Sequence, residues 1–464
     1  MRRLIFARAG SRPSLLGLLV GGATSVAVAA VALGATAVAQ PDQAPPQTLL
    51  EATHLPPLLV MPGERVSLAF DVHCAQAGVE APEQSCLLSG SLFVRGGSAG
   101  HFRELALAQN DAAGLRLLDS AVPDAVAQDP RGFEYYAEIE ASGSGDRIRI
   151  PAGVGGTYRA YPARNAVEVE LAPRPLGSVR RGSRVITAPW GDGPLQVGLE
   201  PGPNADPIGA SSFDADTSGT VVLLDEAHRR ALRFARTAHV PEVIPLAIDG
   251  HLADLTIDEN QSMDVLESVA PPGRGPFVRR FDRGGRSLGA VETVDRSPSQ
   301  IRMGPNGPVV LEHPSHLWVP VAANGISLQP AEQLRHGRVG RPLRSGAEVV
   351  VSRTIDELRL ALVSRSRIQT SWRIASPEHL GEVQLAEPLG DRLVVVVRVY
   401  DEHSDEFRVL VLDRRGLVQQ FAVESADWAE TAPLSRFRLI GGSLYQLGSD
   451  PAGAFVDRYD LEVR

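Results

Sequence analysis

The sequence predicts an all-β protein in which a small β-sandwich is followed by a β-propeller. Glycine and proline are abundant, with 45 and 35 of the 464 residues, which suits a chain with many turns. Residues 49–173 contain short runs in which apolar and polar residues alternate, the pattern of half-buried strands. From residue 185 onward, apolar runs recur at intervals of about forty to fifty residues, which is typical of four-stranded propeller blades.

Residues 1–39 have the pattern of a signal peptide. Arginines precede an uncharged tract of 25 residues at 15–39, and the small residues Ala37 and Ala39 at its end fit an A-x-A cleavage site before Gln40. The tract is also long enough to cross a bilayer (about 20 residues are needed), so an uncleaved amino-terminal anchor is the alternative. We predict an exported protein of bacterial type, extracellular or in the cell envelope, with no membrane span after cleavage.

The sequence that follows the signal peptide indicates a spacer and then the sandwich. Residues 40–48 are rich in proline and glutamine and are expected to form a disordered spacer. The sandwich is predicted over residues 49–173, where alternation is strict at 66–74 and again at 133–140. About seven short strands without helical periodicity favour a sandwich of two sheets.

The chain has only two cysteines, Cys74 and Cys86. In an oxidising compartment such a pair usually forms a disulfide. The spacing is not the C-x-x-C of redox and metal sites, and both residues lie beside predicted strands. We therefore predict a structural disulfide between Cys74 and Cys86.

Residues 174–184 are predicted to form a linker, and residues 185–464 the propeller. Six apolar segments align on equivalent positions with steps of 42, 46, 40, 46 and 49 residues. These positions are Val221, Met263, Val309, Val349, Val395 and Leu444. Six copies predict six blades, with five or seven as the alternatives. The last copy leaves room for about three strands, so a strand within 179–189 is expected to pair with it and close the ring.

The first propeller repeat resembles an NHL-type repeat. It contains a short strand, a turn from Asp216 to Gly219, an apolar strand that ends in Asp225, and a further strand at 229–234. The resemblance implies a propeller whose loops surround a central cavity at one end. Relatives of similar fold include protein-binding NHL modules, gluconolactonase-like hydrolases and amidating lyases. The predicted sandwich resembles an immunoglobulin-like or fibronectin type III module in its late Tyr-Tyr strand and the Val-Glu-Val-Glu-Leu strand at 167–171.

Three polar residues occupy the same place in consecutive repeats: Asp225, Glu267 and His313. If they face the central channel, they form a carboxylate–imidazole cluster able to hold calcium or zinc, or to activate water. The alternative, which we favour, is that such a residue hydrogen-bonds the backbone of its own blade. Residues 214–219 also imitate the start of a calcium loop, but a hairpin turn built by Asp216 and Gly219 is the preferred interpretation.

The net charge of the chain and the catalytic motifs that its sequence lacks narrow the range of possible functions. The formal net charge of −9 disfavours nucleic acid as a partner, because phosphate binding requires a positive surface. The sequence contains no nucleophile elbow, phosphate-binding loop or zinc-protease motif. The leading hypothesis is a non-enzymatic binding or scaffold protein, without a cofactor, that presents propeller loops to a protein, glycan or small ligand. The alternative is a metal-dependent hydrolase or lyase of the gluconolactonase-like type, with its metal ligands in the central channel.

Mass spectrometry of the mature protein tests the export prediction. We expect the secreted chain to begin at Gln40, because Ala37 and Ala39 fit the small-residue positions of a cleavage site. Substitution of Ala39 by phenylalanine is expected to block this cleavage and to leave the longer chain associated with membranes. An intact amino terminus at Met1 in the wild-type protein would establish the anchored alternative.

Overall fold

The computed structural model divides the chain into two compact units, Met1–Pro46 and Gln47–Arg464, and every residue it describes lies in the second. The described residues are 48–76, 87–97, 100–112, 115–142, 144–152, 155–200, 207–236, 240–249, 251–269, 274–294, 298–312, 315–323, 325–430 and 435–461. The predicted signal peptide and, except for residue 48, the predicted spacer lie outside them. Export and cleavage therefore stay predictions.

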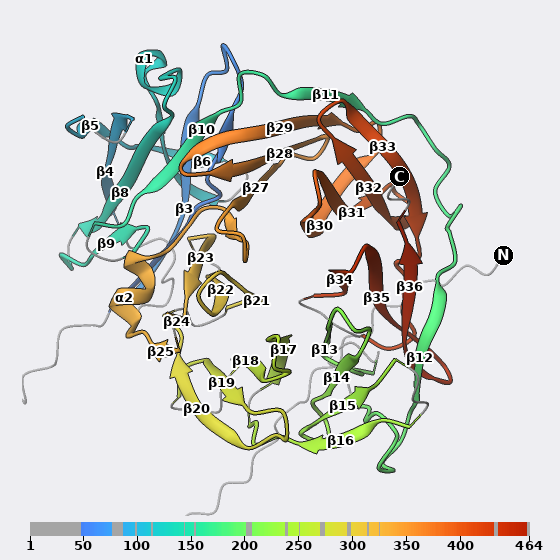
Figure 1. Ribbon diagram of the computed structural model, residues 1–464. Helices are drawn as coiled ribbons and strands as arrows, with labels where there is room; N and C mark the ends of the chain where they lie inside the picture. The colour runs from blue at the N-terminus through green and yellow to red at the C-terminus, as the bar shows by residue number, and fades with distance from the viewer. Residues whose placement is uncertain are drawn as a thin grey trace, which may run out of the picture. The chain divides into compact units, whose positions relative to one another are not determined.

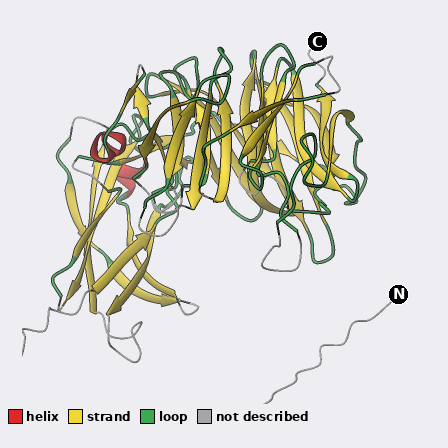
Figure 2. Cartoon of the chain, turned by 90° about the horizontal axis from the view of Figure 1, so that it is seen from below, coloured by secondary structure: helices red, strands yellow, loops and turns green. Residues whose placement is uncertain are grey.

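The fold is all-β, as the sequence predicts (Figure 2). Within the described residues, helical structure is confined to α1 (Asp124–Ala127) and α2 (Pro330–Arg335). None of the helices found there has the length and hydrophobicity needed to span a membrane. All of the remaining regular structure consists of strands.

Two sheets form the first part of the described chain, and we refer to them together as the amino-terminal module (residues 48–162). One has the order β1-β3-β7-β6 and consists of β1 (Thr48–Thr53), β3 (Ser67–Gln76), β7 (Leu115–Ala121) and β6 (Ala108–Ala112). The other has the order β2-β10-β8-β4-β5, with β9 paired to β8. Its strands are β2 (Leu59–Val60), β10 (Tyr158–Pro162), β8 (Phe133–Ser142), β4 (Leu87–Gly96), β5 (Arg103–Ala106) and β9 (Arg147–Ile150).

The two sheets of the module share one apolar core. Along β3, Leu68 and Phe70 are buried and alternate with exposed residues, as predicted for residues 66–74. The same cluster contains Leu92 of β4 and Tyr135 of β8, which belong to the second sheet. Each sheet therefore has one face directed toward the other, because side chains alternate between the two faces of a strand.

Cys74 lies on β3 with its side chain buried in a small cluster that includes Ala141. Its predicted partner, Cys86, lies outside the described residues. The disulfide between these two residues therefore stays a prediction.

Six further sheets of three or more strands lie in a ring, within the residues that the structure describes (Figure 1). The first consists of β13 (Ser212–Ala215), β14 (Val221–Asp225), β15 (Arg230–Phe234) and β16 (Glu242–Pro245). The second consists of β17 (His251–Ile257), β18 (Met263–Val269), β19 (Phe277–Phe281) and β20 (Ser287–Glu292). The third consists of β21 (Gln300–Met303), β22 (Pro308–Glu312) and β23 (Leu317–Pro320), and the hairpin β24 (Ala322–Ala323) and β25 (Ile326–Ser327) follows it.

The other three sheets complete the circle. The fourth consists of β26 (Arg341–Pro342), β27 (Glu348–Arg353), β28 (Glu357–Ser364), β29 (Arg367–Ala375) and β11 (Val167–Glu170). The fifth consists of β30 (His379–Leu389), β31 (Arg392–Tyr400), β32 (Asp405–Asp413) and β33 (Gly416–Val423). The sixth consists of β34 (Phe437–Ile440), β35 (Ser443–Asp450), β36 (Gly453–Asp460) and β12 (Ser183–Pro189). This radial arrangement is that of a β-propeller.

The spacing of the apolar runs locates one strand in each sheet of the ring. The six positions aligned in the sequence lie on β14, β18, β22, β27, β31 and β35. All of β14 and the run Leu393–Val397 of β31 are buried, because neighbouring sheets cover both faces of these strands. This explains why they read as continuous Val/Leu runs instead of alternating ones.

The strand predicted to close the ring does so. β12 pairs antiparallel with β36, with Ala188 opposite Ala454 and Pro189 opposite Gly453. The outer edge of the last sheet is thus covered by a strand that precedes the first sheet in sequence. Closure of this kind removes an exposed strand edge.

The predicted last strand of the sandwich lies elsewhere. β11 pairs in parallel with β29, so the assignment of residues 166–171 to the sandwich was wrong. Alternation of Val167 and Val169 with glutamates indicates a half-buried strand, but it does not specify a partner. The outer edge of the fourth sheet provides that partner.

Residues 216–219 form a hairpin turn. This is the interpretation that the sequence favours over a calcium loop. The carboxylate of Asp216 accepts hydrogen bonds from the amides of Ser218 and Thr220 at 2.9 and 3.0 Å. The next sheet repeats the device with Asp258. Each aspartate thus satisfies backbone donors of its own turn, which is a common role of aspartate in turns.

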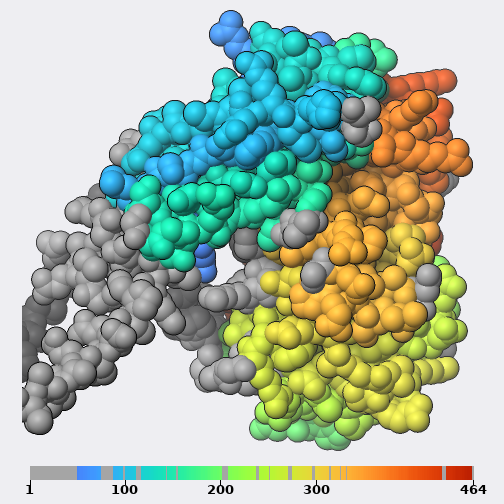
Figure 3. Space-filling model, turned by 90° about the vertical axis from the view of Figure 1, so that its left-hand side faces the viewer, coloured from blue at the N-terminus to red at the C-terminus, as the bar shows by residue number. Residues whose placement is uncertain are grey.

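The amino-terminal module packs against the ring. Figure 3 shows its blue and cyan atoms against the orange part of the ring, and one apolar cluster contains side chains of both, such as Leu59 and Val350. Arg359 of β28 donates to both carboxylate oxygens of Glu64, at 2.9 and 2.7 Å, and to the carbonyl of Leu59 at 3.1 Å. A shared core and a guanidinium with three acceptors in the module, besides Glu357 on its own strand, fix β2 against the fourth sheet.

Substitution of Gly453 by alanine tests the closure of the ring. A Cβ atom added at this position would overlap the carbonyl oxygen of Ala188, so we expect the variant to lose about 1–3 kcal/mol of unfolding free energy. The thermal unfolding midpoint measures the loss. Gly284→Ala is the matched control, because the nearest atom to its Cβ is 3.5 Å away. Equal midpoints for the two variants would contradict the closure argument.

Candidate functional site

The inner strands of the ring carry buried charges at its centre. Asp254 of β17 is fully buried and accepts hydrogen bonds from the hydroxyl of Ser212 at 2.6 Å and the amide of Ile301 at 3.0 Å. Two guanidinium groups also donate to its carboxylate, Arg302 at 3.0 Å and Arg438 at 3.2 Å. One carboxylate thus connects β13, β17, β21 and β34, which belong to four sheets.

A second carboxylate completes this arrangement. Asp214 accepts a hydrogen bond from the hydroxyl of Thr256 at 3.1 Å and forms an ion pair with Nε of Arg438 at 3.4 Å. The hydroxyl of Ser435 accepts hydrogen bonds from both Arg302 and Arg438. We call this set the central cluster; its members are Ser212, Asp214, Asp254, Thr256, Arg302, Ser435 and Arg438. Its two carboxylates and two guanidinium groups balance in charge.

The guanidinium groups keep Asp254 ionised. Burial alone would raise the pKa of Asp254, but the positive charges of Arg302 and Arg438, followed by hydrogen bonds from Ser212 and Ile301, outweigh it and hold the pKa below its ordinary value. Burial lowers the pKa of Arg302 to about 10, and the charge of Arg438 acts in the same direction. At neutral pH both partners of this buried pair are therefore charged.

Two cavities lie beside the central cluster. The module-side cavity has a volume of about 430 Å³ and is lined by strands of the third, fourth and fifth sheets and by Leu55 and Leu58 of the amino-terminal module. The loop-side cavity, of about 770 Å³, is lined by the turns that follow the inner strands. Arg302, Arg341 and Glu387 line both cavities. Both volumes fall within the range of small-molecule sites, about 300–1,000 Å³.

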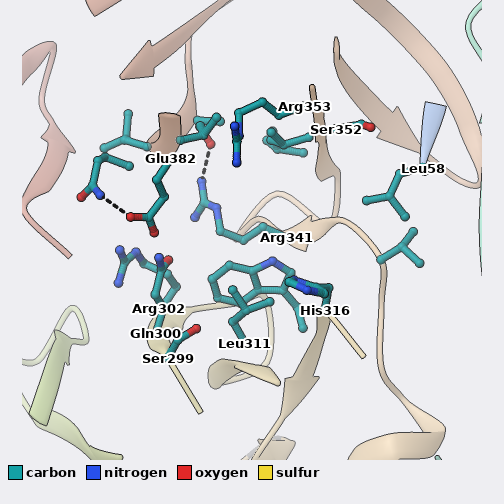
Figure 4. Close-up of a pocket in the computed structure, with 18 of the residues that line it drawn as sticks. Leu58, Ser299, Gln300, Arg302, Leu311, His316, Arg341, Ser352, Arg353 and Glu382 are labelled. Atoms are coloured by element: carbon teal, nitrogen blue, oxygen red, sulfur yellow. Dashed lines mark hydrogen bonds between the residues drawn. The ribbon is translucent and has the colours of Figure 1, made fainter. Parts of the chain in front are cut away.

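The module-side cavity has an apolar side and a polar side (Figure 4). Its apolar lining comes from both parts of the chain: Leu55, Pro56, Leu58, Leu311, Trp318, Val339, Val349, Val351, Val383, Leu385 and Ala386. In Figure 4, Arg341, Arg353 and Glu382 gather on one side, and Leu58 lies on the other. This combination of apolar walls with a few converging polar groups is typical of ligand pockets.

Arg341 is held firmly at the polar side. Its Nη2 donates to the carbonyl of Ala386 at 2.9 Å and lies 3.4 Å from a carboxylate oxygen of Glu387. The charge of Arg341 is therefore paired within the ring. It acts as a fixed wall between the two cavities.

Glu382 and Arg353 have fewer partners. The carboxylate of Glu382 accepts a hydrogen bond from the side-chain amide of Gln384 at 2.9 Å. Nη1 of Arg353 donates to the backbone carbonyl of Leu380 at 2.6 Å. Burial raises the pKa of Glu382, and the positive charges of Arg353 and Arg398 offset part of that effect. Within the described residues, neither Glu382 nor Arg353 has an opposite charge within 4.0 Å, so both have polar atoms left for a ligand.

Asp225 is the first of the predicted metal ligands. Its carboxylate interacts with side chains of its own sheet and with the backbone of the preceding loop. Its carboxylate accepts from Nε of Arg230 at 2.8 Å and from the amide of Gly198 at 3.1 Å, and it lies 2.7 Å from Nδ1 of His228. These donors occupy both carboxylate oxygens. The arrangement favours the structural role over metal binding.

Glu267 repeats this pattern in the next sheet. One carboxylate oxygen pairs with Arg279, and the other accepts the amide of Asp249 at 2.8 Å. His313 lies outside the described residues, so the predicted three-residue cluster stays untested as a whole. In the part of the chain that is described, no group of three or more His, Cys, Asp or Glu side chains is placed to hold a metal ion.

The sequence did not predict the central cluster, although Asp214 belongs to the segment that imitates a calcium loop. The predicted site residues, such as Asp225, end the apolar second strands, whereas the central cluster comes from the first strands. A signal was present there: Asp254, Arg302 and Arg438 each stand as a single charge between apolar neighbours on a short strand. A charge in that setting either faces solvent from a half-buried strand or is buried and paired, so the pattern marks these residues as candidates without deciding between the two.

No protein-family model matches the chain, and no curated protein matches it by sequence. Solved structures similar in part include a virginiamycin B lyase from Staphylococcus aureus, 10% identical over 54% of this chain and 95% of that one, with a TM-score of 0.32. A glucose dehydrogenase is 12% identical over 61% and 99%, with a TM-score of 0.34. A protein of unknown function from Bacteroides thetaiotaomicron is 9% identical over 90% and 98%, with a TM-score of 0.29. At these scores nothing about the activity of this chain follows.

Substitution of Asp254 by asparagine tests the central cluster. The change leaves two buried guanidinium groups without their shared counterion, so we expect a loss of about 3–5 kcal/mol of unfolding free energy. Urea unfolding at neutral pH measures it. The matched control is Asp282→Asn, an aspartate that serves an exposed turn and is expected to cost far less.

The difference in stability between the wild-type protein and Asp254→Asn has a predictable pH dependence. Because the pKa of Asp254 is lowered in the folded state, its contribution is complete above the ordinary aspartate pKa of about 3.9 and declines as the pH falls below that value. The difference in unfolding midpoint between wild type and Asp254→Asn is therefore expected to be constant from pH 7 to about pH 5 and to shrink toward pH 3. A difference that grows on acidification would contradict the assignment.

Proposed function

We propose that this chain is an exported, non-enzymatic binding protein that takes up a small organic ligand in the module-side cavity. On this proposal the six sheets of the ring are the blades of a six-bladed propeller, and the amino-terminal module is a β-sandwich attached to it. The observation that carries the proposal is a cavity of about 430 Å³ with apolar walls and a polar side. Its size and lining match those of ligand sites in general.

The polar groups of this cavity suit binding better than chemistry. Arg341 and Arg302 are tied to Glu387 and Asp254, so they serve as fixed hydrogen-bond donors and not as groups that exchange protons. Glu382 and Arg353 add one acceptor and one donor that approach the ligand from strands β30 and β27. A ligand with an apolar body and a hydrogen-bonding end satisfies both sides of the cavity.

Fluorescence titration with N-phenyl-1-naphthylamine, a neutral apolar probe that brightens in apolar surroundings, tests the proposal. We expect saturable binding at one site in the wild-type protein. Ser352→Phe, which places a ring in the cavity lining, is expected to weaken binding by at least about tenfold, or about 1.4 kcal/mol. Ser327→Phe adds the same ring at an exposed position on β25 and is expected to leave binding unchanged. An absence of saturable binding, or equal affinities for the two variants, would refute the proposal.

A further inference from the structure

The wall of the module-side cavity contains residues from the amino-terminal module. Leu55, Pro56 and Leu58 line the cavity, and they belong to the segment that connects β1 to β2. The remainder of the lining comes from the ring. A site of this kind is composite, because neither part of the chain encloses it alone.

Leu55 stands out among these residues because its side chain is 69% exposed. Leu58, three residues later, is 6% exposed and belongs to the core shared by the module and the ring. A large apolar side chain that is left exposed beside a cavity gains from being covered by an apolar ligand. Leu55 therefore offers an apolar contact that folding itself does not use.

The segment that carries Leu55 is anchored on its amino-terminal side by a buried histidine. His54 is stacked on Phe70 with ring centroids 4.3 Å apart. Its Nδ1 lies 2.7 Å from the carbonyl of Ala69 and must donate to it, so Nε2, at 2.8 Å, accepts from the hydroxyl of Tyr135. Burial lowers the pKa of His54 to about 4, which leaves the imidazole ring neutral at neutral pH.

The segment is anchored equally well on its other side. Arg359 holds the carbonyl of Leu59 and the carboxylate of Glu64, so β2 is fixed to the fourth sheet. Residues 55–58 therefore span two rigid supports. A wall held in this way is preorganised, and a ligand loses little free energy in ordering it.

We infer that the amino-terminal module is part of the binding site and that residues 55–58 select ligands with an apolar group at the end opposite Arg353 and Glu382. This inference rests on the proposed function of the same cavity and adds the class of ligand: an amphipathic small molecule whose hydrocarbon or aromatic part contacts Leu55. It also assigns the module a role, because the ring on its own lacks this wall.

Titration of Leu55→Ser with N-phenyl-1-naphthylamine tests the inference. We expect the affinity for the probe to fall by about fivefold or more, because the apolar contact is lost, and Leu55→Met to retain most of it. Leu87→Ser is the matched control: Leu87 is an exposed leucine of the same module, 75% exposed, and it does not line the cavity. Both leucines are exposed, so both serine variants are expected to unfold at the wild-type temperature.

The outcomes separate the inference from the proposal on which it rests. Suppose that Leu55→Ser binds the probe as well as the wild type does, whereas Ser352→Phe does not bind it. This result would overturn the role of the module and keep the cavity as the ligand site. A wild-type protein that does not bind the probe would overturn both. Binding that is weakened by both Leu55→Ser and Ser352→Phe, and left unchanged by Leu87→Ser, supports both.

Discussion

The last contacts made at the centre of this protein, those of Arg438 with Asp214 and Asp254, depend on the closure of the ring by β12 and β36. The sixth sheet has only three strands of its own, and the fourth comes from a segment that precedes the first sheet in sequence. This pairing brings β34 of the last sheet next to β13 of the first. The ion pair between Asp214 and Arg438 crosses that same seam. Closure of the ring and the contacts of Arg438 in the central cluster therefore stabilise each other.

The central cluster in turn shapes the cavities. Burying a charge is costly unless it is paired and hydrogen-bonded, and Asp254 meets this condition only when three neighbouring sheets supply their donors. With its charges balanced, the cluster contributes little net potential to the adjacent space. If the cavity binds a ligand as proposed, its selectivity is therefore set by residues outside the cluster, chiefly Arg353, Glu382 and the apolar wall.

The sequence predicted the repeating part of the fold well and the centre of the ring poorly. Apolar runs such as the one at Val395 recur because every sheet of the ring buries apolar residues of its second strand, so their spacing is visible in the sequence. Partners that are distant in sequence leave no such trace: β11 alternates correctly, yet its pattern does not show that it pairs with β29. Asp254 meets Arg438 only after the ring closes, so no local motif records their contact. The cavity also depends on long-range contact, because Leu55 and Arg353 are brought together by the packing of the module against the ring.

The way in which the module is attached bears on its role. It is joined to the ring by a shared core, by Arg359 with its three acceptors, and by β11, which continues from the module into the fourth sheet. Attachments of this number and kind fix distance and orientation far beyond what a flexible linker provides. A ligand that contacts Leu55 at one end and Arg353 at the other gains from both contacts only if their separation is constant. The rigid attachment of the module meets that requirement, and it accounts for the module and the ring forming one compact unit.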